Sequence, residues 1–113
     1  MTILSNKKNQ LAVLHFTASN TTTIAGNSSV SGIAVGDESL TGGYVKGLAW
    51  TGTWTIARGA NTIWSTINSG DLDFTSVGMP LTQDATATLV CTLTGSGSIL
   101  VKVGKIGHGS SDY

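Results

Sequence analysis

The chain has 113 residues and no formal net charge, because six Lys and Arg residues balance six Asp and Glu residues. Charged residues make up 11% of the sequence, against the roughly 25% that is usual in a globular domain. This length corresponds to one domain that can bury a core. The composition argues against a disordered chain and against nucleic acid as a partner, because phosphate binding requires clustered basic residues. Low charge also favours a protein that covers part of its surface with neighbouring molecules.

One cysteine is present, and it limits the redox chemistry that the chain can perform. A single thiol excludes an internal disulfide, and the apolar neighbours of Cys91 predict a buried, unreactive side chain. The first residues lack the apolar segment of a signal peptide, and no run approaches the about 18 apolar residues that a membrane span requires. We therefore expect a protein that is made in the cytoplasm and has no membrane partner.

The N-terminal segment differs in composition from the rest of the chain. Residues 1–10 are polar after Leu4 and are predicted to form an extended N-terminal arm, which either frays or docks on a neighbouring molecule. Residues 11–113 are predicted to form a single β-domain, because short alternating segments and Gly-rich turns follow one another through this range.

The first part of this domain is predicted to contain four strands. They cover residues 11–18, 21–25, 30–35 and 44–50. The acidic residues Asp37 and Glu38 fall between the last two of these strands. They are predicted to lie in a solvated loop, on opposite sides of an extended chain.

A two-residue turn is predicted where the first of three tryptophans ends its strand. Gly52 follows Thr51 there, and glycine supplies the positive φ that a hairpin turn requires. Two further strands are expected at 53–58 and 62–67, joined by a second Gly-containing turn. The three strands around these turns are predicted to form a meander with one apolar face and one Thr-rich face.

The three tryptophans are predicted to differ in exposure. Trp54 shares its strand face with Ile56, which places it in the core. Trp64 shares its face with Thr62 and Thr66, so it is predicted to be the most exposed of the three. An exposed tryptophan marks either a ligand site or a subunit interface, and we favour the interface.

The C-terminal part is predicted to contain a short strand, a loop with the only proline, and a closing hairpin. The short strand covers 71–75, and the hairpin joins strands 86–94 and 98–106 through a turn at 95–97. No segment has the apolar spacing of a helix. The fold class is therefore all-β, a β-sandwich of jelly-roll or Greek-key type with about eight short antiparallel strands.

No combination of residues predicts catalysis. Asp71 and Asp73 point the same way on a regular strand and could bind Ca²⁺ or exchange protons, but two solvated carboxylates are the simpler interpretation. His15 and His108 stand far apart in a chain with one cysteine, so no metal-ligand spacing is present. The G-x-S-x-G nucleophile motif is absent. We expect no catalytic residue, no metal and no cofactor, and hence a protein that is not an enzyme.

The segment 27–106 resembles a group of very small phage virion proteins that occur especially in marine and cyanobacterial phages. The likeness rests on turn residues and strand pattern, namely GNSSVSG at 26–32, GDE at 36–38, WTGTWTIARG at 50–59, LTQD at 81–84 and the Thr-rich closing hairpin. The resemblance implies a β-sandwich protein that decorates the phage head, often as a homotrimer at local threefold positions. It supplies no residue-by-residue functional assignments.

The expected function is therefore that of a head decoration or cement protein. Such a protein binds the outside of the capsid and clamps neighbouring capsomers by many weak contacts, so avidity replaces affinity at a single site. Its partners are the major capsid protein and further copies of itself, with a trimer as the expected oligomer. Its expected location is the capsid surface of the virion, after synthesis in the host cytoplasm.

Two surfaces are assigned to these contacts from the residues themselves. Trp64, Thr62 and Thr66 are predicted to form a subunit interface. The arm lies outside the resemblance, and its exposed apolar and basic residues are predicted to dock on the capsid. They are Ile3, Leu4, Lys7 and Lys8.

The alternative function is a carbohydrate-binding or fibre-tip adhesion module. Aromatic side chains can stack on sugars, and the aromatic candidates are Trp50, Trp54, Trp64, Tyr44 and Tyr113. The favoured glycan site combines Trp64 and Tyr44 with Asp71 and Asp73.

Overall fold

The protein is an all-β molecule built from one antiparallel sheet. The computed structural model describes residues 2–7, 10–58, 61–66, 70–73, 79–80 and 88–108. Within these ranges nine strands are present and no helix, and every strand pairing is antiparallel. The all-β prediction is confirmed. A sandwich of two separate sheets is not confirmed, because hydrogen bonds connect all nine strands into one sheet.

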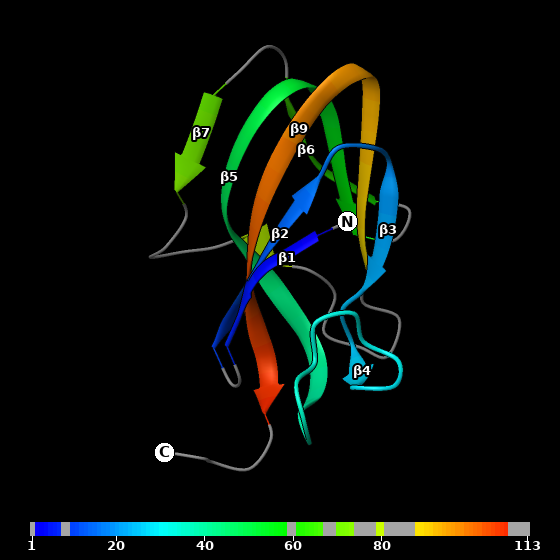
Figure 1. Ribbon diagram of the computed structural model, residues 1–113, viewed down its shortest axis with the longest axis vertical. Helices are drawn as coiled ribbons and strands as arrows, with labels where there is room; N and C mark the ends of the chain where they lie inside the picture. Colours follow the sequence, from blue (N-terminus) through cyan, green and yellow to red (C-terminus); the bar gives the residue numbers. More distant parts are fainter. Residues whose placement is uncertain are drawn as a thin grey trace.

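Two long strands organise the sheet. β5 (Ser39–Arg58) has 20 residues and β9 (Thr88–His108) has 21, and they pair along their whole length, from Ser39↔His108 to Arg58↔Leu89. Figure 1 shows both strands arching over together at the top of the molecule. The β5–β9 ribbon therefore folds back on itself, and one sheet supplies both walls of the core.

Glycines form the corner at which the ribbon folds. The register passes from Thr51↔Ser98 to Thr53↔Thr94, so Gly52 alone lies opposite three residues of β9. Gly52 has a φ of 91°, and a Cβ added there would lie 2.6 Å from the Ser96 carbonyl oxygen. Bulges of this kind let a strand bend and pass from one layer to the next.

The turns predicted at 51–52 and 95–97 are therefore wrong. Each glycine segment bends a continuous strand instead of ending it, and so joins two predicted short strands into one long strand. The physical reason is that the two segments lie opposite each other. Bending one strand alone would break the ladder, whereas bending both at the same level keeps the pairs on either side.

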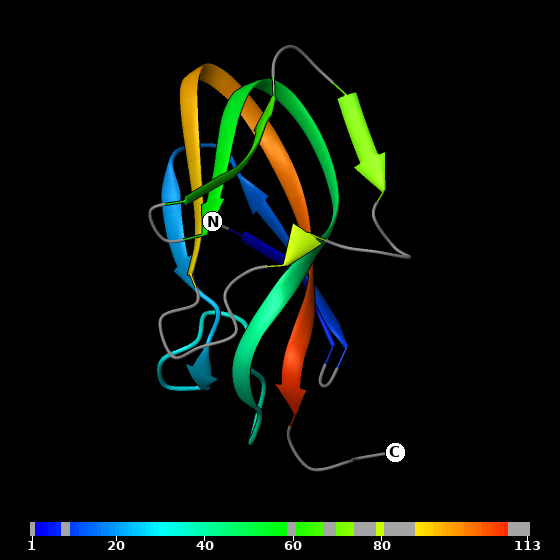
Figure 2. The same ribbon diagram turned by 180° about the vertical axis from the view of Figure 1, so that it is seen from behind.

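The shorter strands flank the two halves of the ribbon. In one half, β3 (Asn20–Thr23) pairs with β9 and β6 (Asn61–Thr66) pairs with β5. In the other half, β1 (Thr2–Asn6) and β2 (Leu11–Phe16) extend the sheet beyond β9. The remaining strands pair with β5 in that same half, and they are β4 (Gly26–Asn27), β7 (Gly70–Asp73) and β8 (Met79–Pro80). Figure 2 shows the molecule from behind.

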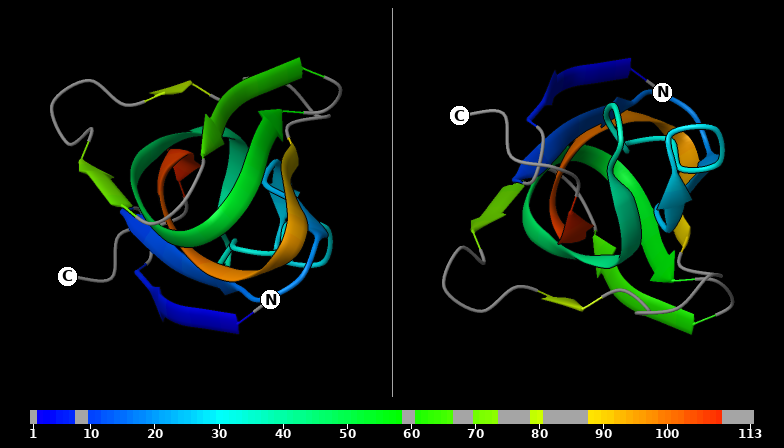
Figure 3. Two further views of the ribbon diagram at one scale, coloured as in Figure 1. Left: turned by 90° about the horizontal axis from the view of Figure 1, so that it is seen from above. Right: turned by 90° about the horizontal axis from the view of Figure 1, so that it is seen from below.

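One hydrophobic core fills the space between the two halves. Seen along the long axis, β5 and β9 curl around the centre of the molecule (Figure 3). Both halves contribute fully buried side chains, as do the connections between strands. The core comprises Ala12, Leu14, Phe16, Ile24, Ala25, Ile33, Leu40, Val45, Leu48, Trp54, Ile56, Leu89, Cys91, Ile99, Val101 and Val103. Trp54 and Cys91 are buried as predicted, and burial raises the pKa of the Cys91 thiol to about 12.

The strand predicted at 30–35 is wrong, because this segment forms turns and bends. The Asn27 carbonyl accepts hydrogen bonds from the backbone N–H groups of Val30 and Ser31. The Ser31 hydroxyl then donates to the Ile24 carbonyl and accepts from the N–H of Ile33. These local bonds satisfy the backbone without a strand partner, and they hold the Ile33 side chain in the core.

The loop that follows ends in a buried ion pair. The Lys105 ammonium lies 2.8 Å from Oε1 of Glu38, and neither side chain is exposed. The same carboxylate oxygen accepts a hydrogen bond of 2.7 Å from the N–H of Val35. The solvated position predicted for Glu38 is therefore wrong, whereas Asp37 is exposed as predicted.

The N-terminal segment is extended, but it lies on the sheet of its own chain. β1 pairs with β2, from Thr2↔His15 to Asn6↔Ala12, and the Asn6 amide donates to the Ile33 carbonyl. The predicted arm thus becomes the edge strand of the sheet, next to β2. Lys8 lies outside the described residues.

Candidate functional site

The outer face of the folded sheet carries a surface hollow. In an antiparallel ladder, residues in register project from the same face. Register therefore aligns one row across four strands, His15–Leu100–Ala49–Asp71. The residues that alternate with this row on β9, such as Ile99 and Val101, are buried in the core, so the row faces outward.

Two small residues of β5 create the hollow. Ala49 lies in the first row, and Gly47 lies in the next one, between Lys102 of β9 and the Asp73 position of β7. The side chains of β7 and β9 stand on either side of this low strip, two strand spacings or about 9.5 Å apart. A groove therefore runs along β5.

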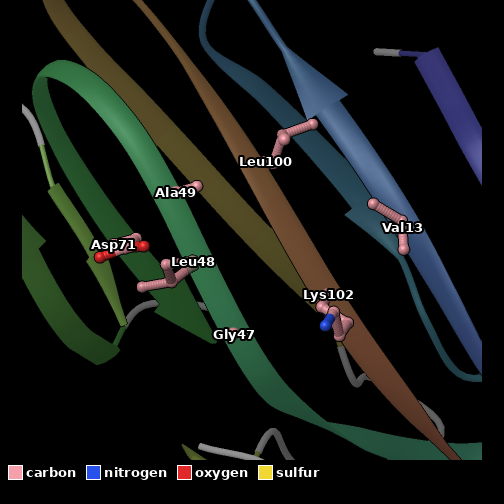
Figure 4. A pocket seen from close by; sticks show the side chains of 7 residues that line it. All are labelled: Val13, Gly47, Leu48, Ala49, Asp71, Leu100 and Lys102. Carbon is pink, nitrogen blue, oxygen red and sulfur yellow. The ribbon is translucent and has the colours of Figure 1, made fainter. Parts of the chain in front are cut away.

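The groove consists of two connected hollows. One has a volume of about 380 Å³ and is lined by Val13, Gly47, Leu48, Ala49, Asp71, Leu100 and Lys102 (Figure 4). The other has about 750 Å³ and is lined by Leu4, His15, Ala49, Trp50, Thr51, Gly70, Asp71, Ser98 and Leu100. Three residues line both hollows, so they form one continuous surface, which we call the β5 groove.

The walls of the β5 groove are apolar in the middle and polar at the margins. Leu100 and Val13 stand on one side of the floor and Asp71 on the other, as Figure 4 shows, and Lys102 continues the first side. At the corner, the hydroxyl of Thr51 accepts a hydrogen bond of 3.1 Å from the N–H of Ser98. This arrangement can bind an apolar surface with a few polar contacts around it.

The predicted interface residues of β6 are only partly at the surface. Thr62 is exposed, but Trp64 is half-buried, lies in register with Ile56 and packs against the core. An irregular step between Ile56 and Ala57 shifts the β5–β6 register, and simple alternation does not anticipate it. The prediction that Trp64 projects from a Thr-rich face opposite Ile56 is therefore wrong. Thr66 occupies the position in register with Trp54.

Three of the four predicted docking residues, Ile3, Leu4 and Lys7, lie at the surface, and Lys8 lies outside the described residues. Ile3 is 40% exposed and Leu4 is 55% exposed, and Leu4 also lines the β5 groove. Lys7 is exposed in the turn that leads to β2, where its carbonyl accepts from the N–H of Gln10. Their exposure agrees with a docking role but does not test it.

The described aromatic residues do not gather into a platform for sugars. Trp50 and Trp64 pack against the core, and Trp54 is fully buried, its indole N–H donating to the Thr51 carbonyl. Tyr44 lies twelve positions before Ile56, the register partner of Trp64, on β5, and the Lys46 ammonium lies 5.5 Å from the centroid of the Tyr44 ring. Tyr113 lies outside the described residues, and so do residues 74 and 75 of the strand predicted at 71–75.

Sequence reasoning missed the β5 groove and the buried Glu38–Lys105 pair. Gly47 and Ala49 give a local signal, since small residues alternate there with larger ones. Their meaning depends on neighbours from β7 and β9, which are distant in the chain. Glu38 and Lys105 are likewise separated by 67 residues, and no local pattern predicts their contact.

In the part of the chain that the structure describes, no three His, Cys, Asp or Glu residues gather as a metal site would require. Within the same residues, no helix is long and apolar enough to cross a membrane. The chain matches no protein-family model, no curated protein and no solved structure.

Proposed function

We propose that this protein is a non-enzymatic virion structural protein that decorates the outside of a phage capsid and stabilises it by clamping neighbouring capsomers. The observation that carries the proposal is the β5 groove, an apolar-centred hollow on a rigid sheet, with exposed Leu4 at its margin. A rigid sheet loses little conformational entropy when it docks, which favours binding through modest contacts.

The charge distribution supports a protein partner over a nucleic acid. The groove has Lys102 on one side and Asp71 on the other, so its field changes sign over a short distance. A polyphosphate requires basic residues in succession, whereas a protein surface of mixed polarity can match both sides. The proposed partner is the major capsid protein, with Ile3, Leu4, Lys7 and Lys8 of the N-terminal segment as further proposed contacts, of which Leu4 lines the groove.

Self-association forms the second part of the proposal. A cement protein gains from having several identical docking surfaces, because each additional contact raises avidity without raising the affinity of one site. The trimer that the resemblance implies is one such arrangement. Trp64, Thr62 and Thr66 of β6 are its proposed subunit contact, and Thr62 is exposed.

Immunogold electron microscopy of phage particles tests the proposal. An antibody against this chain is applied to particles from a lysate in which the chain is expressed, with particles from a lysate without it as the control. Label spread evenly over the heads is the expected result. Label at a single vertex or on the tail would replace decoration by adhesion and make glycan binding the function to test. Particles without any label would overturn the virion assignment.

A further inference from the structure

We propose that the β1 edge of this protein pairs antiparallel with the β1 edge of a second copy, forming a two-fold dimer. β1 is the terminal strand of the sheet order β1-β2-β9-β5-β4, and β2 is its neighbour on one side. Among the residues that the structure describes, no strand pairs with its other side, so the backbone N–H and C=O groups there form an edge of the sheet. Such an edge is a template for another strand.

The β1 edge is short and irregular at Leu4, but it has neither the charge nor the proline with which proteins also protect a sheet edge. Its five residues, TILSN, contain no charge and no proline. Ile3 and Leu4 are two of the three large hydrophobic side chains that are exposed in the described ranges, and both lie on this strand. The opposite margin of the same half differs, because β7 carries the exposed carboxylate of Asp71. Natural edges that remain solvent-exposed are usually shortened, bulged or charged.

A second copy is the occupant that this strand fits. An isologous contact brings residue i of one copy to residue j of the other, and j to i. With the axis at Leu4, each Leu4 meets its counterpart, each Ile3 lies opposite Ser5, and each Thr2 lies opposite Asn6. No charged side chain opposes another in this arrangement, and the formal net charge of each copy is zero.

The geometry around Leu4 favours this axis. The β1–β2 register passes from Ile3↔Leu14 to Ser5↔Val13, so Leu4 has no partner in register on β2. Its side chain stands at the edge, where a matching leucine can cover it. The two Lys7 residues lie at opposite ends of the paired strands, about 20 Å apart at about 3.4 Å per residue. That separation exceeds the screening length of about 8 Å at physiological ionic strength.

The pairing has a consequence for docking that rests on the proposed function. Antiparallel strands of identical copies are related by an axis perpendicular to the sheet, so both copies present the same face to the same side. The two β5 grooves then open in one direction, and one dimer can contact two capsomers at once. Because a five-residue strand makes a small contact, we expect a weak pair that dissociates in the micromolar range or above.

Cysteine cross-linking tests the pairing directly. Cys91 is fully buried and burial raises its pKa, so it provides little background. We expect Leu4→Cys to form a disulfide-linked dimer under mild oxidation, because directly opposed Cβ atoms lie close enough for a disulfide. Val30→Cys is the matched control, since Val30 is 62% exposed but lies outside β1. Equal cross-linking of both variants, or of neither, would overturn the pairing.

A register test separates this axis from other contacts. Ile3→Lys combined with Ser5→Glu places opposite charges across the pair, whereas Ile3→Lys with Ser5→Lys places like charges there. We expect the dimer association constant of the second double variant to be at least tenfold lower than that of the first, by analytical ultracentrifugation. Thermal melting establishes that both variants fold. Equal association constants would contradict the two-fold pairing, which uses a strand other than the β6 contact proposed for the trimer.

These measurements distinguish the dimer from the proposed function. A chain that cross-links through Leu4→Cys but gives no label on particles retains the dimer and loses the virion assignment. A chain that labels phage heads but stays monomeric in ultracentrifugation and cross-linking loses the dimer and the proposed self-association, and retains capsid decoration.

Discussion

Glu38 and Lys105 form an ion pair from which water is excluded, and it connects a loop to the longest strand. Burying two charges is costly, and the pair recovers that cost only while both partners are present. The Val35 N–H adds a second contact to the carboxylate, so the loop before β5 depends on Glu38 as well. The pair therefore contributes more to the position of this loop than to the total stability.

Removal of one partner of this pair should be more harmful than removal of both. We expect Glu38→Gln or Lys105→Met alone to lower the free energy of unfolding by about 3 kcal/mol, because the remaining group is left buried without its partner. The double variant Glu38→Gln with Lys105→Met should lose less than the two single losses added together. Urea unfolding of the four proteins measures the difference. Strict additivity would show that the two groups do not interact.

Trp64 packs against the core, although the alternation of residues in its strand predicted an exposed side chain. Because its ring lies against the core, we expect Trp64→Ala to lower the free energy of unfolding by about 2 kcal/mol, less than a fully buried aromatic residue would lose. Thr62→Ala on the same strand removes an exposed side chain and should change stability by less than about 0.5 kcal/mol. Chemical denaturation compares the two. If Trp64→Ala instead unfolded at the same urea concentration as the parent, the packing role would be excluded.

At the scale of the elements, the corner of the β5–β9 ribbon decides the architecture. A Cβ on Gly97 would clash with the Thr51 carbonyl oxygen, which belongs to the backbone and cannot swing aside. Gly95 has a φ of 82°, but no heavy atom lies within 4 Å of the Cβ position there. At Gly97 a side chain has no room, whereas at Gly95 only the backbone conformation favours glycine.

Alanine substitutions at these two glycines should differ in effect. We expect Gly97→Ala to cost about 3 kcal/mol or more, because two backbones must move apart at the corner. Gly95→Ala should cost about 1 kcal/mol, the penalty of a left-handed conformation for a residue with a Cβ. Thermal unfolding followed by far-ultraviolet circular dichroism gives the comparison. A larger loss for Gly95→Ala than for Gly97→Ala would contradict the close approach at Thr51.

The strands themselves could be predicted from the sequence, but their joining could not. Alternation is local, so it located β2, β3, β6 and the described part of β7 close to their observed bounds. A glycine turn and a glycine corner have the same local pattern, and only the position of the opposite strand separates them. The 30–35 segment also alternates, but its Ser31 hydroxyl supplies the hydrogen bonds that a strand partner would have provided.

The candidate site was predictable only at its margin. Ile3 and Leu4 were expected at the surface, because apolar residues in a polar segment have no local core to enter, and both are exposed. The floor and walls of the β5 groove come from strands far apart in sequence. Cross-strand register brings them together, and a single sequence does not supply that register.

At the scale of the whole molecule, neighbouring residues of β9 lie on opposite faces of the sheet. Leu100 lines the β5 groove, whereas Val101 is fully buried. We expect Leu100→Asp to fold normally and to weaken the proposed binding to capsids at least tenfold, because it places a charge in the apolar centre of the groove. Val101→Asp should prevent folding. Cosedimentation with capsids that lack the protein measures binding, with Val30→Asp as the surface control.

A Leu100→Asp protein that folds and binds capsids as well as the Val30→Asp control would remove the groove from the docking surface. Unfolding of the Leu100→Asp protein would show that its side chain belongs to the core. Either result leaves the β1 pairing open to its own tests.

The continuous β5–β9 ribbon also governs how the chain reaches this structure. Its pairs join residues that are distant in sequence, and Ser39↔His108 spans most of the chain. Such pairs form late, because closing a long loop costs entropy before any contact repays it. Once β5 and β9 have paired on both sides of the corner, neither half can open without disrupting these two strands, which both halves share. Slow folding and slower unfolding would follow, and a protein of this kind persists by the height of its unfolding barrier.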